Sequence, residues 1–76
     1  MREDFPVVQF LRVSAVAHRY ATTASTIWRW SREARFAHLN FPKPIKIGPS
    51  TTAWAVDELD DYDARRVAER DAADAG

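Results

Sequence analysis

Residues 23–36 read TASTIWRWSREARF, and this stretch decides the fold. Apolar residues recur in it at spacings of three and four, which predicts an amphipathic helix from about residue 24 to residue 34. Thr23 precedes this helix and can accept hydrogen bonds from its first free amide groups. The face expected in the core carries Ile27, Trp30 and Ala34. The faces expected in solvent carry Ser25, Trp28, Arg29 and Arg32.

A shorter helix is expected just before this one. Ser14 is a suitable N-cap, and residues 15–20 contain no helix breaker, so we expect a short helix there. Val16 and Tyr20 lie four residues apart and are expected to face the core. Residues 7–13 precede the helix as a short extended segment. Two short helices joined by a tight polar turn make a helix-turn-helix.

A β-hairpin, called the wing below, is expected after a loop at residues 36–41. Residues 43–47 (KPIKI) alternate basic residues with apolar residues or proline, which predicts an extended strand. Residues 48–51 (GPST) supply turn chemistry, and residues 52–55 return as the second strand. The alternation predicts that three apolar side chains pack inward, namely Ile45, Ile47 and Trp54.

The last helix is expected to begin at Asp57 as its N-cap, with acidic residues in the first turn, where the helix dipole favours them. We expect Leu59 and Tyr62 to anchor it to the core. Residues 68–76 contain no large apolar side chain, so we expect one domain over residues 1–67 and a frayed or flexible tail over residues 68–76. The predicted fold class is α+β, a small winged helix-turn-helix with a C-terminal helix.

Charge is distributed unevenly along the chain, although 11 basic and 11 acidic residues give a net charge of zero. Glu33 is the single acidic residue between residues 12 and 46, whereas acidic residues dominate residues 57–74. A polyanion is attracted to the first segment and repelled by the second, so the split defines an orientation on nucleic acid. The basic residues of the first segment are Arg12, Arg19, Arg29, Arg32, Arg35, Lys43 and Lys46.

The composition excludes several classes of site. Without cysteine the chain can form neither a disulfide nor a thiolate metal site, and only His18 and His38 remain as imidazole ligands. No nucleophile with a base, and no metal set, is recognisable, so we expect no enzyme activity, cofactor, metal ion or small-molecule substrate. No apolar run approaches the roughly 20 residues that span a bilayer. The N-terminal segment is too short and too acidic for a signal peptide. We therefore expect a cytoplasmic protein with no membrane partner.

Two sequence patterns together point to a family. Residues 29–35 (RWSREAR) followed by residues 42–48 (PKPIKIG) resemble the pattern of phage excisionases and AlpA-type regulators, and more distantly that of MerR-type winged helices. The resemblance covers roughly residues 11–62. Residues 37–41 depart from the pattern, since they look like an insertion between the second helix and the wing.

The resemblance implies that the second helix lies in the major groove of double-stranded DNA, with Ser25 and Arg29 at base-contacting positions. These two residues lie four apart near the amino end of the helix, and Arg29 can pair bidentately with guanine O6 and N7. Glu33 can pair with some of the neighbouring cations. Candidates for contacts to the DNA backbone are Thr23, Thr26, Trp28, Arg32, Arg35, Lys43 and Lys46. The wing residues Gly48, Pro49, Ser50, Thr51 and Thr52 are expected to clamp the backbone, and they lack the arginine often found there.

The function that the resemblance implies is an excisionase-like recombination directionality factor. Such a protein binds and bends attachment-site DNA, self-associates cooperatively on it, and directs an integrase towards prophage excision in the nucleoid of a bacterial host. An AlpA-like transcription regulator at a promoter is the close alternative. A second alternative is a protein-interaction module, in which Trp28 and the loop of residues 37–41 form an apolar patch that docks an integrase or polymerase.

Overall fold

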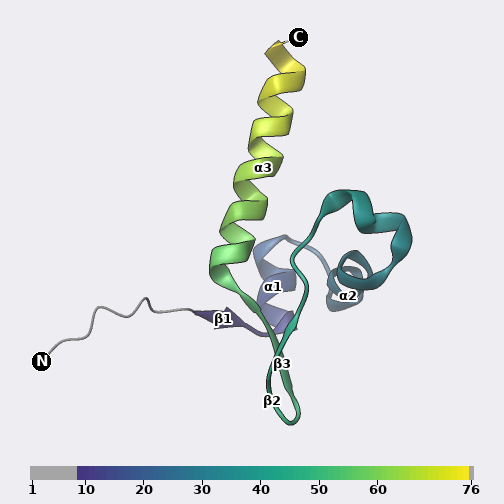
Figure 1. The fold of residues 1–76 in the computed structure, drawn as a ribbon, viewed down its shortest axis with the longest axis vertical. Helices are drawn as coiled ribbons and strands as arrows, with labels where there is room; N and C mark the ends of the chain where they lie inside the picture. The colour runs from purple at the N-terminus through teal and green to yellow at the C-terminus, as the bar shows by residue number, and fades with distance from the viewer. Residues whose placement is uncertain (1–8, 76) are drawn as a thin grey trace, which may run out of the picture.

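A computed structural model describes residues 9–75 of the chain. These residues form an α+β winged helix-turn-helix, as predicted from the sequence (Figure 1). The first two residues of the extended segment expected at residues 7–13 lie outside the described range. In chain order the elements are β1 (Phe10–Leu11), α1 (Val13–Arg19), α2 (Ala24–Arg32), the 3₁₀ helix η1 (Ala34–Leu39), β2 (Ile45–Gly48), β3 (Thr51–Ala55) and α3 (Val56–Ala75).

Helix α1 and the turn after it differ in detail from the sequence prediction. The helix begins at Val13, before Ser14, because the carbonyl oxygen of Arg12 is already the first acceptor and takes the Val16 amide at 3.0 Å. At the other end, the Thr22 amide donates to the Ala17 oxygen at 2.9 Å and the Ala21 amide donates to the His18 oxygen at 3.1 Å. This is a Schellman motif, and it places Ala21 in the left-handed region with φ of 55°.

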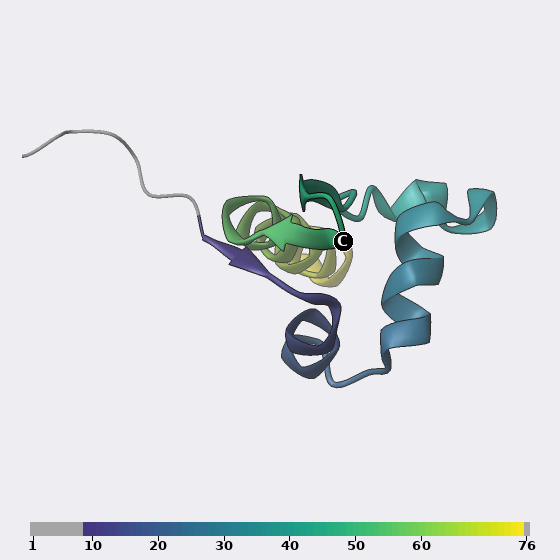
Figure 2. The same cartoon turned by 90° about the horizontal axis from the view of Figure 1, so that it is seen from below.

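Helix α2 begins where the sequence predicts. The Thr23 hydroxyl oxygen accepts the Thr26 amide at 3.3 Å, which confirms Thr23 as the N-cap. The helix crosses α1 steeply, since Figure 2 shows α1 nearly end-on and α2 lengthwise. It ends at Arg32, two residues early, and the expected loop is instead the 3₁₀ helix η1. Asn40 ends η1 in the left-handed conformation, which asparagine tolerates better than most residues.

The core lies where α1, α2, β3 and α3 meet. Four large side chains in it are fully buried, namely Val16, Ile27, Trp54 and Leu59. An aromatic cluster extends this core, with edge-to-face pairs whose ring centroids lie 5.0 to 6.3 Å apart, and its members are Tyr20, Trp30, Phe41 and Tyr62. Tyr20 and Trp30 are half-buried members, whereas Phe41 and Tyr62 are buried. The cluster therefore joins both helices of the helix-turn-helix to α3.

The sheet is antiparallel with β3 in the centre, in the order β1-β3-β2, and its outer strand β2 forms the wing with β3. Trp54 packs inward as predicted, but the prediction for Ile45 and Ile47 is wrong, since their exposed fractions are 37% and 46%. The reason is that β2 is an edge strand, and only residues 53–55 of β3 reach the core. A register shift between Lys46 and Gly48 also interrupts the regular alternation of β2.

Helix α3 starts earlier and ends later than predicted. It begins at Val56, so Asp57 lies in the first turn and is not the N-cap. Leu59 and Tyr62 are buried anchors, as predicted. The helix continues to Ala75, through the segment where fraying was expected. Its last part consists of good helix formers such as Ala, Arg and Glu, with no glycine or proline before Gly76. Whether residues 68–76 act as a separate tail stays a prediction.

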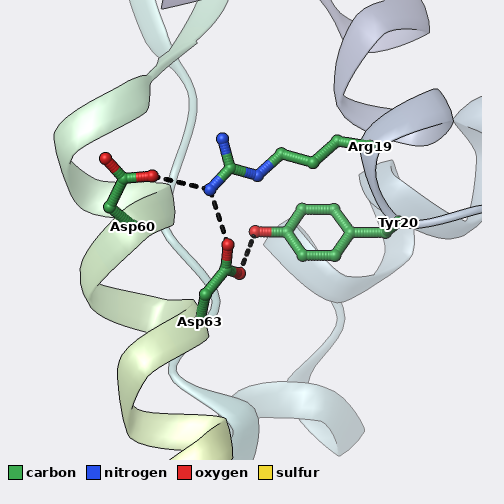
Figure 3. A network of polar contacts seen from close by, with 4 residues as sticks. All are labelled: Arg19, Tyr20, Asp60 and Asp63. Atoms are coloured by element: carbon green, nitrogen blue, oxygen red, sulfur yellow. Dashed lines mark hydrogen bonds and ion pairs between the residues drawn. The ribbon is translucent and has the colours of Figure 1, made fainter.

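A polar network holds α3 against the helix-turn-helix (Figure 3). The Tyr20 hydroxyl donates to Asp63 Oδ1 at 2.6 Å, while Arg19 Nη2 donates to Asp60 Oδ1 at 2.7 Å and to Asp63 Oδ2 at 2.5 Å. Burial and the hydrogen bond to Asp63 raise the pKa of Tyr20 above its ordinary value. The hydrogen bonds to both carboxylates raise the pKa of Arg19. Arg19 is therefore committed to α3, although the sequence places it in the basic segment.

Candidate nucleic-acid interface

Helix α2 presents one polar face to solvent. Ile27 and Ser31 are buried, and the Ser31 hydroxyl donates to the Ile27 carbonyl oxygen at 2.9 Å, so this side of the helix is closed by the core. Ser25, Arg29 and Arg32 are exposed on the opposite side, at positions four and three residues apart. The two residues predicted to contact bases therefore share an accessible face.

Arg29 has two neighbours on this face. Its Nε lies 3.7 Å from Glu33 Oε2, and its guanidinium carbon lies 5.8 Å from the centre of the Phe36 ring. An exposed pair at this helical spacing contributes only about 0.3–0.5 kcal/mol. A bidentate contact to guanine contributes about 1–3 kcal/mol of discrimination, so the ion pair with Glu33 is weak enough to yield to a base.

Glu33 also pairs with Arg35, a second residue that is predicted to contact DNA. Arg35 Nε donates to Glu33 Oε1 at 3.0 Å, and the Arg35 guanidinium carbon lies 4.9 Å from the centre of the Phe36 ring. Phe36 is thus flanked by two arginines. Ion pairs of Glu33 were predicted from the sequence, whereas Phe36 was overlooked because it was assigned to a loop. The position of Phe36 directly after Arg35 in the sequence was the signal that could have identified it.

Trp28 is half-buried, so the expectation that it faces solvent is wrong. Its ring centroid lies 5.0 Å from that of Trp54 on β3, which is fully buried and donates from Nε1 to the Pro42 carbonyl oxygen at 3.1 Å. On its other side the Arg32 guanidinium carbon lies 4.3 Å from the Trp28 ring centroid. The Trp28–Trp54 contact joins the second helix of the helix-turn-helix directly to the wing.

The apolar docking patch suggested for Trp28 and residues 37–41 is not formed. Phe41 is only 5% exposed and belongs to the core, where it packs on Tyr20 and Tyr62. Trp28 uses its ring to cover Trp54. The large apolar side chains suggested for this patch therefore pack within the fold.

Three of the predicted backbone contacts lie at the ends of α2 and have partners inside the protein. Thr23 caps the helix, and its hydroxyl oxygen lies 3.1 Å from that of Thr26. Lys43 Nζ donates to the Ser31 carbonyl oxygen at 3.3 Å, so this cation caps the carboxyl end of the helix, where the dipole is negative. Each of these side chains stabilises α2, and their contact with DNA stays a prediction.

The wing extends from the body at the end of the molecule opposite to the tip of α3 (Figure 1). Lys46, Pro49 and Ser50 are exposed on it, whereas the other predicted wing residues, Gly48, Thr51 and Thr52, are half-buried in the hairpin. Thr52 pairs with Lys46 across the two strands. The predicted wing residues are thus brought together in one hairpin, with an exposed tip at Pro49 and Ser50.

The arrangement separates the two charge segments. Most acidic residues lie on α3, which points away from the wing, and two of them neutralise Arg19. The exposed cations of α2, η1 and the wing lie on other parts of the surface. A polyanion approaching α2 and the wing therefore meets the basic segment, while the far end of the acidic helix lies away from it.

No group of three or more histidine and acidic residues within residues 9–75 is placed to hold a metal ion. Over the same described range, none of the helices combines the length and apolar character needed to cross a membrane.

Comparison with known families identifies the chain. The sequence profile of the family described as prophage CP4-57 regulatory protein (AlpA) matches residues 9–67, which include the helix-turn-helix, the wing and the first half of α3. No curated protein and no solved structure gave a significant match. The family match confirms the resemblance to AlpA-type regulators seen in residues 29–35 and 42–48. Because it spans most of the chain, the protein belongs to the AlpA family of phage regulatory, DNA-binding proteins.

Proposed function

We propose that this protein binds double-stranded DNA at specific sequences, with α2 in the major groove. The single observation that carries the proposal is the exposed face of Ser25 and Arg29, which lies near the amino end of α2. In helix-turn-helix proteins the amino-terminal residues of the second helix contact base edges. Arg29 reads guanine through O6 and N7, and Ser25 makes a shorter and less selective contact.

The wing and the cations around α2 hold the DNA backbone in this proposal. Lys46 and the tip at Pro49 and Ser50 are exposed, and the tip is the part of the hairpin furthest from the core. Arg32 and Arg35 lie at and beyond the carboxyl end of α2. Contacts from these residues set the register and orientation of the protein without reading sequence.

The first candidate for the biological role is transcription regulation at a promoter of a phage-type element. The description of the family as a regulatory protein supports it. In this role the protein acts through binding alone. It then works in the cytoplasm of the bacterial host, associated with the nucleoid.

The second candidate is the excisionase-like role, in which several copies bind and bend attachment-site DNA and direct an integrase towards excision. Its support is the resemblance of residues 29–35 and 42–48 to the excisionase pattern. Both roles use the same winged interface, so they differ in where the protein binds and in whether it touches an integrase.

Footprinting of the purified protein on the genetic element that encodes it tests the proposal. The fragments cover the attachment region and the neighbouring promoters. One protected site overlapping a promoter supports the regulator, whereas adjacent sites filled cooperatively beside the attachment core support the excisionase-like role. Absence of protection on every fragment at low salt contradicts DNA binding altogether, because low salt strengthens phosphate contacts.

A further inference from the structure

Three side chains from α2 and β3 are in contact one after another, and the Trp28 and Trp54 rings are tilted by 58° to each other. The Arg32 guanidinium carbon lies 4.3 Å from the Trp28 ring centroid, and the Trp28 ring centroid lies 5.0 Å from that of Trp54. Trp54 is fully buried, and its Nε1 donates a hydrogen bond to the Pro42 carbonyl oxygen at 3.1 Å. Trp54, the innermost of the three, is therefore fixed by the core, while Arg32, the outermost, is exposed.

Arg32 differs from three other arginines of the basic segment. Arg19, Arg29 and Arg35 each pair with a carboxylate. For Arg32, by contrast, no carboxylate pair is formed within residues 9–75. A guanidinium packed against a ring still has N–H groups that do not contact the ring and can donate to a ligand. The Arg32 cation is thus held in place while its donors stay available.

The chemistry of this arrangement fits a phosphate group. A planar guanidinium fork matches two oxygens of a phosphate, and holding it before binding reduces the conformational entropy that is lost on contact. Arg32 lies seven residues after Ser25, towards the carboxyl end of α2. In the proposed docking the amino end of α2 contacts bases, so its carboxyl end lies nearer to the backbone than to the base edges.

We infer that Arg32 is a pre-positioned binding site for a DNA backbone phosphate, and that Trp28 is the positioning residue that holds it there. Trp28 then acts through Arg32, with Trp54 beneath it, and does not itself contact the DNA. This inference rests on the proposed function, since the phosphate belongs to DNA bound by α2.

Fluorescence anisotropy titrations of a labelled duplex at several salt concentrations test the inference. The duplex carries the footprinted sequence, with a scrambled duplex beside it. Arg32→Ala is expected to lower the magnitude of the log-log salt slope by about 1 and to weaken binding similarly on both duplexes. Trp28→Leu is expected to weaken binding by about two- to fivefold, which is the size of a cation–π contact at an exposed site.

A double-variant cycle separates positioning from general destabilisation. Combined with Arg32→Ala, Trp28→Leu is expected to cause no further loss of DNA affinity, because there is no guanidinium left to position. Arg35→Ala is the matched control. Arg35 lies over Phe36 and not over Trp28, so its loss is expected to add to that of Trp28→Leu.

Two conservative variants keep the test valid if Trp28→Leu fails to fold. Trp28→Phe retains an aromatic face and is expected to bind both duplexes nearly as tightly as the wild type. Arg32→Lys retains the charge but loses the planar fork, so the salt slope is expected to persist while affinity falls. Thermal unfolding of each variant identifies those that remain folded at the temperature of the titration.

The outcomes distinguish the inference from the proposed function. If the wild-type protein binds neither duplex, both fall together. If it binds and Arg32→Ala leaves the salt slope unchanged, the phosphate site is overturned while DNA binding stands. If Arg32→Ala has the expected effect but its losses simply add to those of the Trp28 variants, Trp28 is not a positioning residue.

Discussion

The Arg29 side chain lies on the outer face of α2 between Glu33 and Phe36. The ion pair with Glu33, at 3.7 Å, keeps the guanidinium on this face without holding it tightly. Such an exposed pair is screened by salt, and its free energy is smaller than that of a bidentate guanine contact. In the proposed binding mode, Arg29 therefore exchanges a weak intramolecular partner for a stronger one on DNA.

Arg29→Ala is expected to weaken binding to the cognate duplex by about 1–3 kcal/mol and to change binding to scrambled DNA little. The physical reason is that a base contact is lost and no phosphate contact is removed. Competition titrations with the two duplexes measure both affinities. Lys46→Ala serves as the control, because an exposed wing cation is expected to affect both duplexes alike. Equal losses for Arg29→Ala on the two duplexes contradict its role in reading bases.

At the scale of single elements, the turn between α1 and α2 contains one strained residue, Ala21. Ala21 occupies the left-handed position of the Schellman motif, with φ of 55°. This conformation costs an L-residue about 1–2 kcal/mol, whereas glycine adopts it freely at an entropic cost of about 0.5–1 kcal/mol. The turn sets the angle at which α2 leaves α1. The two hydrogen bonds of the Schellman motif offset the cost of the strained conformation.

Ala21→Gly is expected to raise the free energy of unfolding by about 0.5–1 kcal/mol, because relief of the strain exceeds the added chain entropy. Urea denaturation followed by circular dichroism measures the change. Ala15→Gly, at an exposed position inside α1, is the matched control and is expected to destabilise the protein by about 1 kcal/mol. A loss of stability for Ala21→Gly comparable to that of the control contradicts the account of the turn.

Elements built from local contacts were the ones predictable from the sequence. The periodicity of residues 24–34 and the hydroxyl of Thr23 sufficed for α2 and its cap, because both depend on neighbours within one or two turns. The exposure of Ser25 and Arg29 followed from the same periodicity. The wing was also predictable as a hairpin, since proline and turn residues act locally.

The positions of side chains relative to other elements were not predictable in the same way. Trp28 contacts Trp54 on β3, and the two are far apart in sequence. The exposure of Ile45 and Ile47 depends on how far the core reaches along the sheet, which alternation alone does not show. The extension of α3 beyond residue 67 follows from the helix propensity of its residues. The prediction gave more weight to the lack of an apolar anchor in this segment.

At the scale of the whole molecule, the contact between Tyr20 and Asp63 ties α3 to the helix-turn-helix. Burial and this hydrogen bond raise the pKa of Tyr20 in the folded state above its unfolded value of about 10. The folded state therefore keeps a proton that the unfolded state releases at high pH. This stabilisation is fully present below about pH 10 and is lost progressively as the pH rises above that value.

Urea midpoints measured between neutral pH and high pH are expected to fall above about pH 10, and to fall less steeply in Tyr20→Phe. Burial also raises the pKa of Tyr62, which remains in the variant and accounts for part of the residual slope. Tyr20→Phe is expected to be less stable than the wild type at neutral pH, since the Asp63 carboxylate loses a donor. Parallel pH profiles for the two proteins contradict a titrating role for Tyr20.

The far end of α3, residues 68–75, is exposed and carries acidic residues. In the proposed cooperative assembly, its acidic residues meet the basic segment of the next protein. Deleting residues 68–76 is expected to leave binding to one isolated site unchanged and to abolish cooperativity between two adjacent sites. Titrations of one-site and two-site duplexes measure both quantities. Cooperativity that survives the deletion unchanged excludes this part of α3 from any contact between copies.

The most direct test of the central claim, that α2 reads the major groove through Arg29, is methylation interference on the footprinted site. Methylation at guanine N7 blocks an acceptor that only the major groove presents. We expect that methylating one or more guanines in the site prevents binding of the wild-type protein, and that Arg29→Ala no longer discriminates at that guanine. Binding that is indifferent to N7 methylation at every guanine of the site contradicts the claim.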